Sequence, residues 1–389
     1  MKIPMVDLQV QYESLKDEVD AAIGNVFDSC AFILGPEVER FETAFAAFHG
    51  AEACVAVSNG TDALTLTLRA LGIGKGDEVI TTPQTFGATL EAICLVGARP
   101  VLVDIDPDVY TMRVDQVESV VTERTRVILP VHIYGHPVDM GRLMEIAERD
   151  DLFVIEDTAQ AHGAEYKGRL VGTIGTAGTF SFYPGKNLGA YGDAGGIVTN
   201  DTELAQRLKS LRNHGQQPGA KFYYHFIGYN NRMDGIQGAV LNVKLPRLRA
   251  WNDARRSHAD AYRAGLGDLP NLKMPKESAD ARHVYHLFVM ETDDRDRLTE
   301  ELGNAGIASG VQYPHPIQLT PAYAHLGYRL GDFPIYEAAC SRIVSLPMYP
   351  ELTAEQVAYV IDAVRRVAGG ELTDRLEAEK TSSPVFAAA

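Results

Sequence analysis

From about residue 50, short β-branched runs alternate with segments of helical periodicity, and this alternation is the feature that most constrains the fold. It is typical of an α/β fold with a mostly parallel sheet. Ligands of such sheets bind at the carboxyl ends of the strands, so polar residues there are the first candidates for function. The predicted strands are residues 54–57, 78–81, 101–103, 127–131 and 153–155, and the predicted helices between them are 62–70, 88–96 and 140–148.

The pattern changes in the last third of the chain, which predicts a second, smaller domain of α+β type. We expect an N-terminal arm and large domain over residues 1–250, a small domain over 251–370, and a flexible tail over 371–389. The elements predicted here are a helix-prone stretch from 242 through Trp251 to 266, a strand at 283–290, a helix at 295–305, a Pro-rich loop at 313–321 and a last helix at 354–367.

Composition excludes several classes of protein. The 389 residues include 52 acidic and 36 basic side chains, a formal charge of −16 that opposes binding to nucleic acid or to anionic membranes. No run of about 18 apolar residues and no signal-like N-terminus occurs, so we expect a cytoplasmic protein. The four cysteines lie far apart without metal-like His/Cys spacing, which predicts no metal site.

Lys186 is the most informative single residue. It lies in a loop of glycines and aromatics between two β-prone runs, and no charged residue follows until Asp193. Most lysines are solvated surface charges, but this setting presents an amine to a ligand. A nucleotide P-loop is excluded because Phe180 and Asn187 stand where that motif needs Gly and Ser or Thr.

Two other strand-to-helix turns carry candidate binding groups. The segment SNGTDAL at 58–64 opens a helix, where Gly60 and Thr61 could supply donors to a phosphate. Helix capping is the simpler explanation for the same residues. In the segment TPQTFG at 82–87, Phe86 could stack on a flat ligand or pack in the core.

A carboxylate pair follows the apolar strand that begins at Phe153. Asp157 is placed to pair with a cationic ligand nitrogen, and capping of the next turn is its alternative role. Glu156 is its rival, but strand alternation sends the two side chains to opposite faces, so only one of them faces the site. We expect His162 to be a structural hydrogen-bonding residue.

Taken together, these segments supply the binding chemistry of one cofactor. Pyridoxal phosphate needs an amine for its aldehyde, an acid for its pyridine nitrogen, donors for its phosphate and a surface against its ring. The residues that fit these needs are Lys186, Asp157, Gly60, Thr61, Ser181 and Phe86.

The chain resembles the DegT/DnrJ/EryC1/StrS family of sugar aminotransferases over residues 3–366. The motifs that carry the resemblance are SNGTDAL at 58–64, VIEDTAQAHG at 154–163, SFYPGK at 181–186, GDAGG at 192–196 and GYNNRMDGIQ at 228–237, with IPMVDL at 3–8 and ILGPE at 33–37. The resemblance implies fold type I of the pyridoxal phosphate enzymes: a large domain with a mainly parallel seven-stranded sheet, a small α+β C-terminal domain, and a homodimer with shared active sites.

The resemblance also assigns roles to single residues. Lys186 corresponds to the lysine that binds the cofactor covalently and then moves a proton, and Asp157 to the partner of the pyridine nitrogen. The other correspondences are Gly60, Thr61 and Ser181 to the phosphate, Phe86 to ring stacking, Gln160 to the ring hydroxyl, Asn230 to the phosphate of the neighbouring subunit, and Arg232, Tyr313 and His315 to the substrate. The loop after Tyr313 departs from the family pattern Y-P-x-P-x-H-x-Q, since Gln318 and Thr320 occupy its polar positions.

The activity implied is transfer of an amino group from glutamate or glutamine to a keto-sugar, usually nucleotide-linked, in deoxyamino-sugar biosynthesis for antibiotics or polysaccharides. The N-terminal match and Arg232 favour amination at C3 over C4. A dehydrating relative carries histidine where this chain has Lys186, which argues against dehydration. Two alternatives stay open: amination of a cyclitol ketone of the scyllo-inosose type, and a regulatory or sensory protein without turnover.

Overall fold

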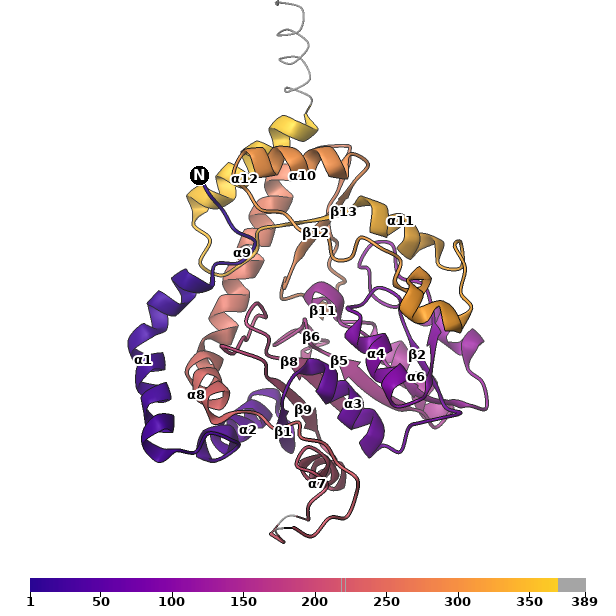
Figure 1. Cartoon of the computed structure of the whole chain (residues 1–389). Coiled ribbons are helices and arrows are strands. Elements are labelled where there is room, and N and C mark those ends of the chain that lie inside the picture. The colour runs from indigo at the N-terminus through magenta and orange to yellow at the C-terminus, as the bar shows by residue number, and fades with distance from the viewer. Residues whose placement is uncertain (218, 221, 370–389) are drawn as a thin grey trace, which may run out of the picture.

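A seven-stranded sheet forms the centre of the computed structural model, which describes residues 1–217, 219–220 and 222–369 (Figure 1). Strands β8, β5, β4, β2 and β3 pair in parallel, whereas β9 is antiparallel to both β1 and β8. This confirms the mainly parallel seven-stranded sheet expected from the sequence. In sheet order the strands are β1 (Ala53–Val57), β9 (Gly195–Thr199), β8 (Ala177–Ser181), β5 (Phe153–Asp157), β4 (Thr125–Ile128), β2 (Glu78–Thr81) and β3 (Arg99–Leu102).

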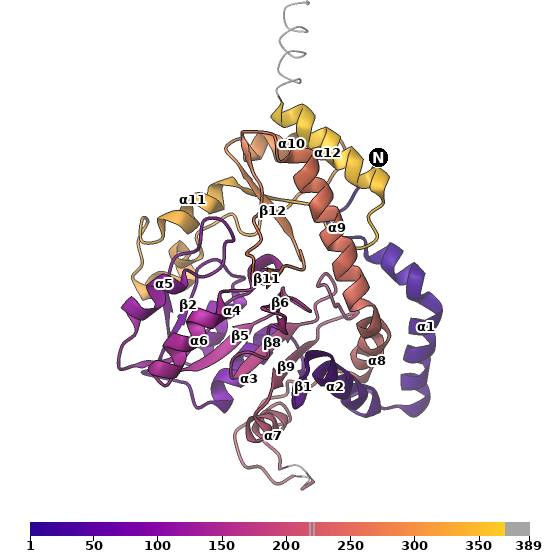
Figure 2. The ribbon, with the colours of Figure 1, turned by 180° about the vertical axis from the view of Figure 1, so that it is seen from behind.

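Helices cover both faces of this sheet. In Figure 1, α3 and α4 stand in front of the strands, and the view from behind in Figure 2 brings α6 forward. The α6 helix forms because Asp139 caps its N-terminus and Met140, Leu143 and Ile146 recur on one buried face. The helices are α3 (Gly60–Ala70), α4 (Ala88–Leu95), α5 (Val114–Val117), α6 (Met140–Arg149) and α7 (Thr202–Leu211).

Two N-terminal helices lie along one side of the sheet. The α1 helix (Leu8–Ser29) and the α2 helix (Pro36–His49) both pack against α8 (Gly235–Lys244). At the α2–α8 contact a Cβ on Gly238 would lie 2.9 Å from the backbone nitrogen of Val38, so only glycine allows this approach. The N-terminal arm is thereby tied to the chain segment that follows the Asn230 and Arg232 region.

The C-terminal part is a smaller α+β unit built on the long helix α9 (Leu248–Leu266), which runs across the boundary expected at 250/251. Ile3 is buried in the core of this unit and pairs with Ile307, so the first residues of the chain pack with the last third. The remaining elements are the sheet β10 (Leu272–Lys273), β12 (Phe288–Thr292) and β13 (Ile343–Leu346) with helices α10 (Arg295–Asn304), α11 (Pro334–Arg342) and α12 (Ala354–Ala368).

The smaller elements complete the fold and correct one prediction. A third sheet joins β11 (Ala281–Arg282), β6 (Glu165–Tyr166) and β7 (Arg169–Leu170), and 3₁₀ turns span Glu118–Val120, Ile133–Gly135, Leu245–Arg247, Ile317–Leu319 and Pro321–Leu326. The strand expected at 283–290 begins only at Phe288, because Tyr285 has a left-handed backbone (φ 44°) that a strand cannot hold. The tail expected at 371–389 lies outside the described residues.

Candidate active site

Asp157 ends strand β5 at the carboxyl edge of the sheet, and it is 6% exposed. One carboxylate oxygen accepts a hydrogen bond from the Thr89 hydroxyl (2.8 Å) and the other accepts one from the backbone N–H of Ala159 (3.1 Å). Burial raises the pKa of Asp157, and these two bonds and the Lys186 charge only partly oppose the rise. The carboxylate therefore retains acceptor capacity for a further, preferably cationic, donor.

Glu156, its neighbour on β5, faces the other side of the sheet and is fully buried. Its oxygens accept hydrogen bonds from the backbone N–H groups of Gly172 (2.7 Å), Ile174 (2.8 Å) and Gly175 (2.8 Å). The ring nitrogen Nε2 of His132 lies 3.1 Å away and donates, since its Nδ1 accepts from the Val138 N–H. Although burial alone raises the pKa of Glu156, these donors lower it overall. Of the two carboxylates, Glu156 has its acceptors filled by the protein and Asp157 does not.

Lys186 lies in the loop between β8 and β9, and its backbone N–H is held by the Tyr183 carbonyl (2.8 Å). The loop is tight at Gly189, where a Cβ would lie 2.3 Å from the carbonyl oxygen of Pro184. Burial lowers the pKa of the Lys186 amine to about 8, against the opposing negative charge of Asp157. Within residues 1–217, 219–220 and 222–369, the Lys186 amine forms no hydrogen bond and no ion pair. It is therefore available to a ligand.

The start of α3 combines capping with unused donors. Asn59 caps the helix by accepting from the Asp62 N–H (2.8 Å), while the Asp62 carboxylate is held by Ser58 and Asn59. The N–H groups of Gly60 and Thr61 precede the first intrahelical bond, and no acceptor for them occurs within the described residues. Capping and anion binding are therefore served by different groups of the same turn.

Ser181 stands beside this helix start. A Cβ on Gly60 would lie 2.7 Å from the Cβ of Ser181, so the absence of a side chain at Gly60 is what allows the close approach. The last residue of β8 and the first residue of α3 thereby present a hydroxyl and two N–H groups at one place. This arrangement suits an oxyanion such as a phosphate.

Three further predicted residues line the region next to Asp157. Phe86 is 60% exposed, which excludes the core alternative for it, and its ring centre lies 6.0 Å from that of Tyr313. Gln160 accepts from the Tyr134 N–H (2.7 Å) and its amide nitrogen lies 3.3 Å from the Tyr313 hydroxyl. Burial raises the pKa of Tyr313 to about 12, so its hydroxyl stays protonated at neutral pH.

Arg232, Asn230 and His315 lie at the periphery. The backbone N–H of Ser58 donates to the Asn231 carbonyl (3.2 Å), which places the segment with Asn230 and Arg232 beside the start of α3. Arg232 donates to the Asn213 side chain (3.1 Å) and forms no ion pair among the described residues. Asn230 and His315 are exposed, and His315 offers only its carbonyl, to Tyr336.

Two residues support the site from behind, Thr89 and His162. Thr89 was not predicted; it holds Asp157 from α4, a contact across 68 positions that no local pattern signals. His162, expected to be a structural residue, is fully buried, and the Ser181 backbone lies beside its ring. Its ring packs against Phe180 and Phe182, and burial lowers its pKa well below the ordinary value. His162 is thus a neutral packing residue behind the site.

Residues 13–365 match the profile of the DegT/DnrJ/EryC1/StrS aminotransferase family. The chain belongs to this family. The match confirms the family and the enzyme class that the sequence motifs predicted. Among the described residues no helix is long and apolar enough to cross a membrane.

Relatives match over nearly the whole chain. A pleiotropic regulatory protein of Geobacillus stearothermophilus is 47% identical over 94% of this chain and 98% of its own length. A dTDP-3-amino-3,4,6-trideoxy-α-D-glucose transaminase of Streptomyces venezuelae is 46% identical over 94% of this chain and 96% of its own. The chain is therefore similar both to a named transaminase and to a named regulator.

Solved structures agree with this assignment. The crystal structure of S. venezuelae DesV in complex with a ketimine intermediate superposes with a TM-score of 0.92 at 46% identity, covering 94% of this chain and 98% of that one. Bacillus subtilis NtdA with bound PMP gives a TM-score of 0.87 at 32% identity, covering 95% and 85% of the two chains. The fold is that of the pyridoxal phosphate aminotransferases, as expected.

The residues at the edge of the sheet fit pyridoxal phosphate. A free amine, a buried carboxylate with spare acceptor capacity, a cluster of donors at the α3 start and an exposed aromatic face are the four complements that this cofactor needs. They come from the end of β5, the end of β8 and the loop after it, the start of α3 and the turn before α4. The chemistry of the donor set thus agrees with the family.

Proposed function

We propose that this enzyme transfers an amino group from glutamate or glutamine to a keto-sugar, most plausibly a nucleotide-linked keto-deoxysugar, with C3 favoured over C4. The observation that carries the proposal is the free Lys186 amine facing the charge of Asp157, in a family whose relatives are named as transaminases. Three of those relatives are named for sugars with an amino group at position 3.

Lys186 and Asp157 would do the chemical work. Bound pyridoxal phosphate supplies an electron sink for the carbon that loses its proton. The Asp157 carboxylate would hold the pyridine nitrogen in its protonated form, because a buried anion is stabilised by a cation beside it. Lys186 would hold the cofactor through its aldehyde and would carry a proton at Nζ; its pKa of about 8 suits both base and acid roles near neutral pH.

The surrounding residues would position the reactants. Gly60, Thr61 and Ser181 hold the phosphate, and the exposed Phe86 ring covers one face of the cofactor. Gln160 would reach the ring hydroxyl with its amide nitrogen, because its carbonyl oxygen already accepts from the Tyr134 N–H. These contacts fix the cofactor so that the carbon to be deprotonated meets the Lys186 amine.

Arg232, Tyr313 and His315 are the proposed substrate residues. Arg232 has no carboxylate partner among the described residues, which suits bidentate recognition of a diphosphate or a sugar carboxylate. Gln318, at one altered position of the loop, is buried and bonded to Glu337 (3.1 Å), so it supports the loop instead of facing a sugar. The proposed specificity therefore lies with Tyr313 and His315.

A cyclitol ketone is the second candidate substrate, favoured by that altered loop. A regulator without turnover is the third, since relatives carry the names pleiotropic regulatory protein and sensory transduction protein. The retained Lys186 and Asp157 argue for turnover. The deciding experiment is a half-reaction screen on the purified, cofactor-loaded protein, followed by absorbance from about 330 to 430 nm.

In that screen glutamate or glutamine should bleach the cofactor band, and a productive ketone should restore it. We expect nucleotide-linked 3-keto-deoxysugars to restore it faster than 4-keto-sugars or scyllo-inosose. Restoration by scyllo-inosose alone would establish the cyclitol function. No response to either donor would overturn the aminotransferase function and leave the regulatory one.

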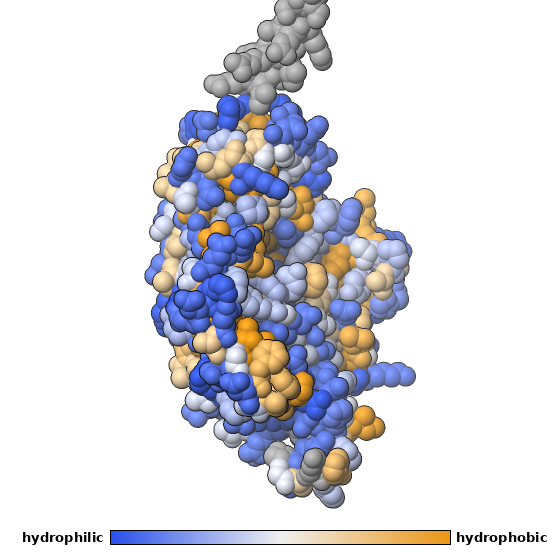
Figure 3. Space-filling view, turned by 60° about the vertical axis from the view of Figure 1, so that its left-hand side comes forward, coloured by the Kyte–Doolittle hydropathy of each residue, from blue (hydrophilic) through white to orange (hydrophobic). Residues whose placement is uncertain are grey.

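We also propose a cytoplasmic homodimer in which Asn230 reaches the phosphate of the neighbouring subunit. Hydrophobic side chains gather on the face that carries α1 (Figure 3), and the exposed ones at the α1–α2 junction are Phe27, Phe32 and Ile33. A second exposed group, Tyr223, Tyr224, Phe226 and Ile227, precedes Asn230. Exposed patches of this kind mark interaction surfaces.

Mixing two inactive variants tests the shared site. Lys186→Ala and Asn230→Ala are refolded together, and mixed dimers should regain about a quarter of the wild-type activity because half the dimers are mixed and one of their two sites is intact. No recovery, with dimers seen by light scattering, would place Asn230 in its own subunit's site.

We further propose that the chain divides into two domains at 250/251, with α9 as the element common to both.

A further inference from the structure

Asn187, the residue after Lys186, fixes this part of the loop from outside. It is 2% exposed, and its amide nitrogen donates to Oδ1 of Asn252 (2.9 Å) and to the Val284 carbonyl (3.1 Å). Its amide oxygen lies 3.2 Å from Nδ1 of His286. Asn252 belongs to α9, whereas Val284 and His286 lie on the segment that leads into β12. One side chain therefore ties the Lys186 loop to the smaller C-terminal unit.

The hydrogen-bond roles at Asn187 assign the proton of His286. The Val284 carbonyl can only accept, so the amide nitrogen of Asn187 faces it and the amide oxygen faces His286. Nδ1 of His286 must therefore donate. Burial and, next, the positive charge of Lys186 hold the pKa of His286 well below its ordinary value, so the ring is neutral and Nε2 carries no proton. Within the described residues Nε2 forms no hydrogen bond, which leaves Asn187 as the polar partner of the ring.

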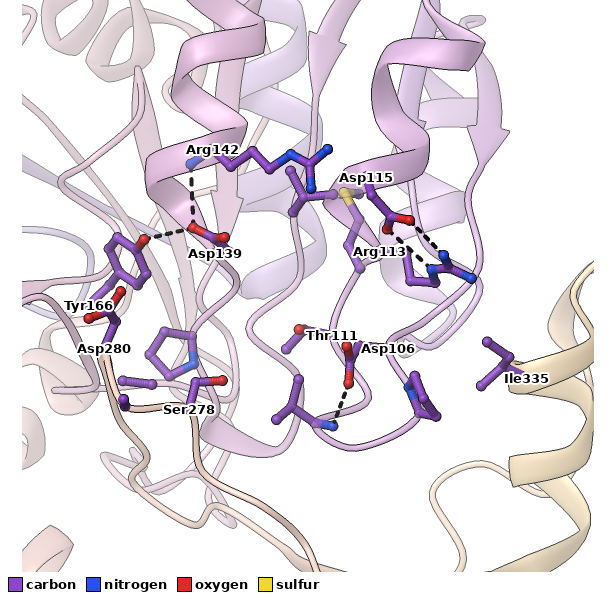
Figure 4. Close-up of a pocket in the computed structure, with 17 residues that line it drawn as sticks. Asp106, Thr111, Arg113, Asp115, Asp139, Arg142, Tyr166, Ser278, Asp280 and Ile335 are labelled. Atoms are coloured by element: carbon purple, nitrogen blue, oxygen red, sulfur yellow. Dashed lines mark hydrogen bonds and ion pairs between the residues drawn. The ribbon is translucent and has the colours of Figure 1, made fainter.

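The segment that carries His286 lies against the first half of the chain from residue 278 onward. Figure 4 shows Ser278 in the wall of a surface hollow that Tyr166 and the start of α6 also line. The Ser278 N–H donates to Nε2 of His136 (3.1 Å), and Ala281 pairs with Tyr166 where β11 joins β6. The segment is thus already seated on the rest of the chain before it reaches His286.

The turn at 284–287 then fixes the backbone of His286. The Val284 N–H donates to the Gly135 carbonyl (3.0 Å), and the Leu287 N–H donates to the Tyr134 carbonyl (3.3 Å). A Cβ on Gly135 would lie 3.1 Å from the backbone nitrogen of His286, so the two segments touch closely. His286 therefore approaches the loop from a fixed backbone and can act as a fixed point for Asn187.

Asn187 is the anchor nearest to the Lys186 amine. On the other side of Lys186, the two preceding residues form no hydrogen bond within the described part of the chain, and the Lys186 N–H bonds to Tyr183 inside the loop. Farther along, Lys244 of α8 donates to the Gly189 carbonyl (2.8 Å). The bonds of Asn187 are thus the external ones that act next to the point where the Lys186 side chain begins.

We propose that His286 and Asn187 are positioning residues for the reaction: the Nδ1–H of His286 fixes the amide of Asn187, and Asn187 holds the Lys186 amine in its buried place beside Asp157. This role rests on the proposed function of Lys186 and adds two residues that act through it. Without the His286 donor, the loop would loosen and water would reach the amine. The pKa of Lys186, lowered by burial to about 8, would then rise toward its ordinary 10.5, and less free amine would be present at neutral pH.

The test is the rate at which the full-length protein, freed of cofactor, captures pyridoxal phosphate, followed by absorbance between about pH 6 and 10. Borohydride trapping and mass spectrometry check that Lys186 carries the cofactor. His286→Phe keeps a ring and removes the donor. His286→Asn keeps a donor, because its amide nitrogen is as many bonds from the backbone as Nδ1, whereas His286→Gln moves the amide one bond farther out.

His258→Phe is the matched control. It removes a ring-nitrogen hydrogen bond of similar length, from α9 to the Pro350 carbonyl (3.2 Å), that does not involve the Lys186 loop. Urea denaturation of every variant measures its stability. A loss of stability alone lowers the amount of folded protein without moving the pH midpoint of capture.

For wild type, the rate of capture should rise with pH through a midpoint of about 8. His286→Phe and His286→Gln should raise the midpoint by about one unit and slow capture at pH 7 about tenfold, since one unit changes the free-amine fraction about tenfold. His286→Asn and His258→Phe should keep the wild-type midpoint.

The proposal is overturned if His286→Phe keeps the wild-type midpoint, or if His286→Asn and His286→Gln behave alike. The comparison of these two amides decides the case even if His286→Phe does not fold. Capture is measured before any donor or ketone is added. The expected midpoints with a failed half-reaction would therefore refute the proposed function and leave this role standing, whereas unchanged midpoints with an intact half-reaction would do the opposite.

Discussion

The two faces of strand β5 place neighbouring carboxylates in opposite electrostatic situations. Glu156 meets three backbone N–H groups and His132, and its pKa falls despite full burial. Asp157 meets one hydroxyl and one N–H, and its pKa rises. The protein thus fills the hydrogen-bond acceptors of the carboxylate on one face of β5. On the other face, the carboxylate keeps an acceptor for a further donor.

This difference shows how the fold separates stability from function. The Glu156 face ties β5 to the 172–175 turn with a complete set of donors, and such sets hold a structure in one conformation. The Asp157 face keeps a negative charge that is only partly compensated, next to the Lys186 amine, whose own pKa is lowered to about 8. Groups with pKa values displaced in this way cluster at functional sites. Substitutions on the two faces should therefore have different consequences.

The largest expected effect comes from Lys186→Ala. Loss of the proton-carrying amine should lower kcat about 10⁴-fold, the upper end for general acid–base catalysis. The folded protein should persist, because the amine makes no hydrogen bond within the described residues. Single-turnover kinetics with glutamate measures the effect, and circular dichroism checks the fold. Retention of more than about a tenth of the activity would remove Lys186 from the chemistry.

Asp157→Ala should lower kcat by about 10²–10³-fold, because the charge that stabilises the protonated pyridine is lost. KM for the acceptor should change much less, since Asp157 lies on the strand end and not in the loop with Tyr313. Steady-state kinetics with saturating cofactor separates the two parameters. Glu156→Gln, which alters the opposite face, is the control and should change kcat by much less. If kcat fell equally in Asp157→Ala and Glu156→Gln, the two faces of β5 would not differ in function.

Glu156→Gln should instead destabilise the protein, by about 2–3 kcal/mol. The amide that replaces one oxygen would point donor hydrogens at N–H groups of the 172–175 turn, so a buried set of bonds is left unmatched. Urea denaturation at pH 7 measures the free energy of unfolding. A loss below about 0.5 kcal/mol would mean that Glu156 does not hold β5 to that turn.

The sequence predicted much of this site because the relevant signals are local. An apolar strand running into Asp157, and a loop of glycines and aromatics around Lys186, are both read within a few residues. Alternation along β5 showed that only one of Glu156 and Asp157 faces the site. Which one it is depends on the pairing of β5 with β4 and β8, and on Gly172 and its neighbours folding back onto Glu156.

Other features depend on contacts that sequence patterns do not carry. Thr89 reaches Asp157 from another strand-to-helix unit of the chain. The burial of His162 between Phe180 and Phe182 likewise follows from tertiary packing and not from its neighbours in sequence. The late start of β12 has a similar cause, since the left-handed turn at Tyr285 is set where Val284 bonds back to Gly135.

The smallest effect is a gain in stability. Asp157→Asn should raise the free energy of unfolding of the cofactor-free protein by about 1 kcal/mol at pH 7, because it removes a buried charge that the protein does not neutralise. Since folding raises the pKa of Asp157 above its ordinary 3.8, the wild-type protein loses this penalty as the pH falls and the carboxyl becomes protonated, so the advantage of the variant should shrink on acidification.

For Glu156 we expect the opposite dependence of stability on pH. Folding lowers its pKa below the ordinary 4.5, so its stabilising effect is full above that pH and is lost as the pH falls through the folded-state value. Urea unfolding of wild type, Asp157→Asn and Glu156→Gln between about pH 2 and 8 measures both trends. As the pH falls, the free energy of unfolding of Asp157→Asn should approach the wild-type value from above. That of Glu156→Gln should approach it from below. If the free energy of unfolding of both variants depended on pH in the same way, the two carboxylates would have the same effect on stability. The division of β5 into a structural and a functional face would then be wrong.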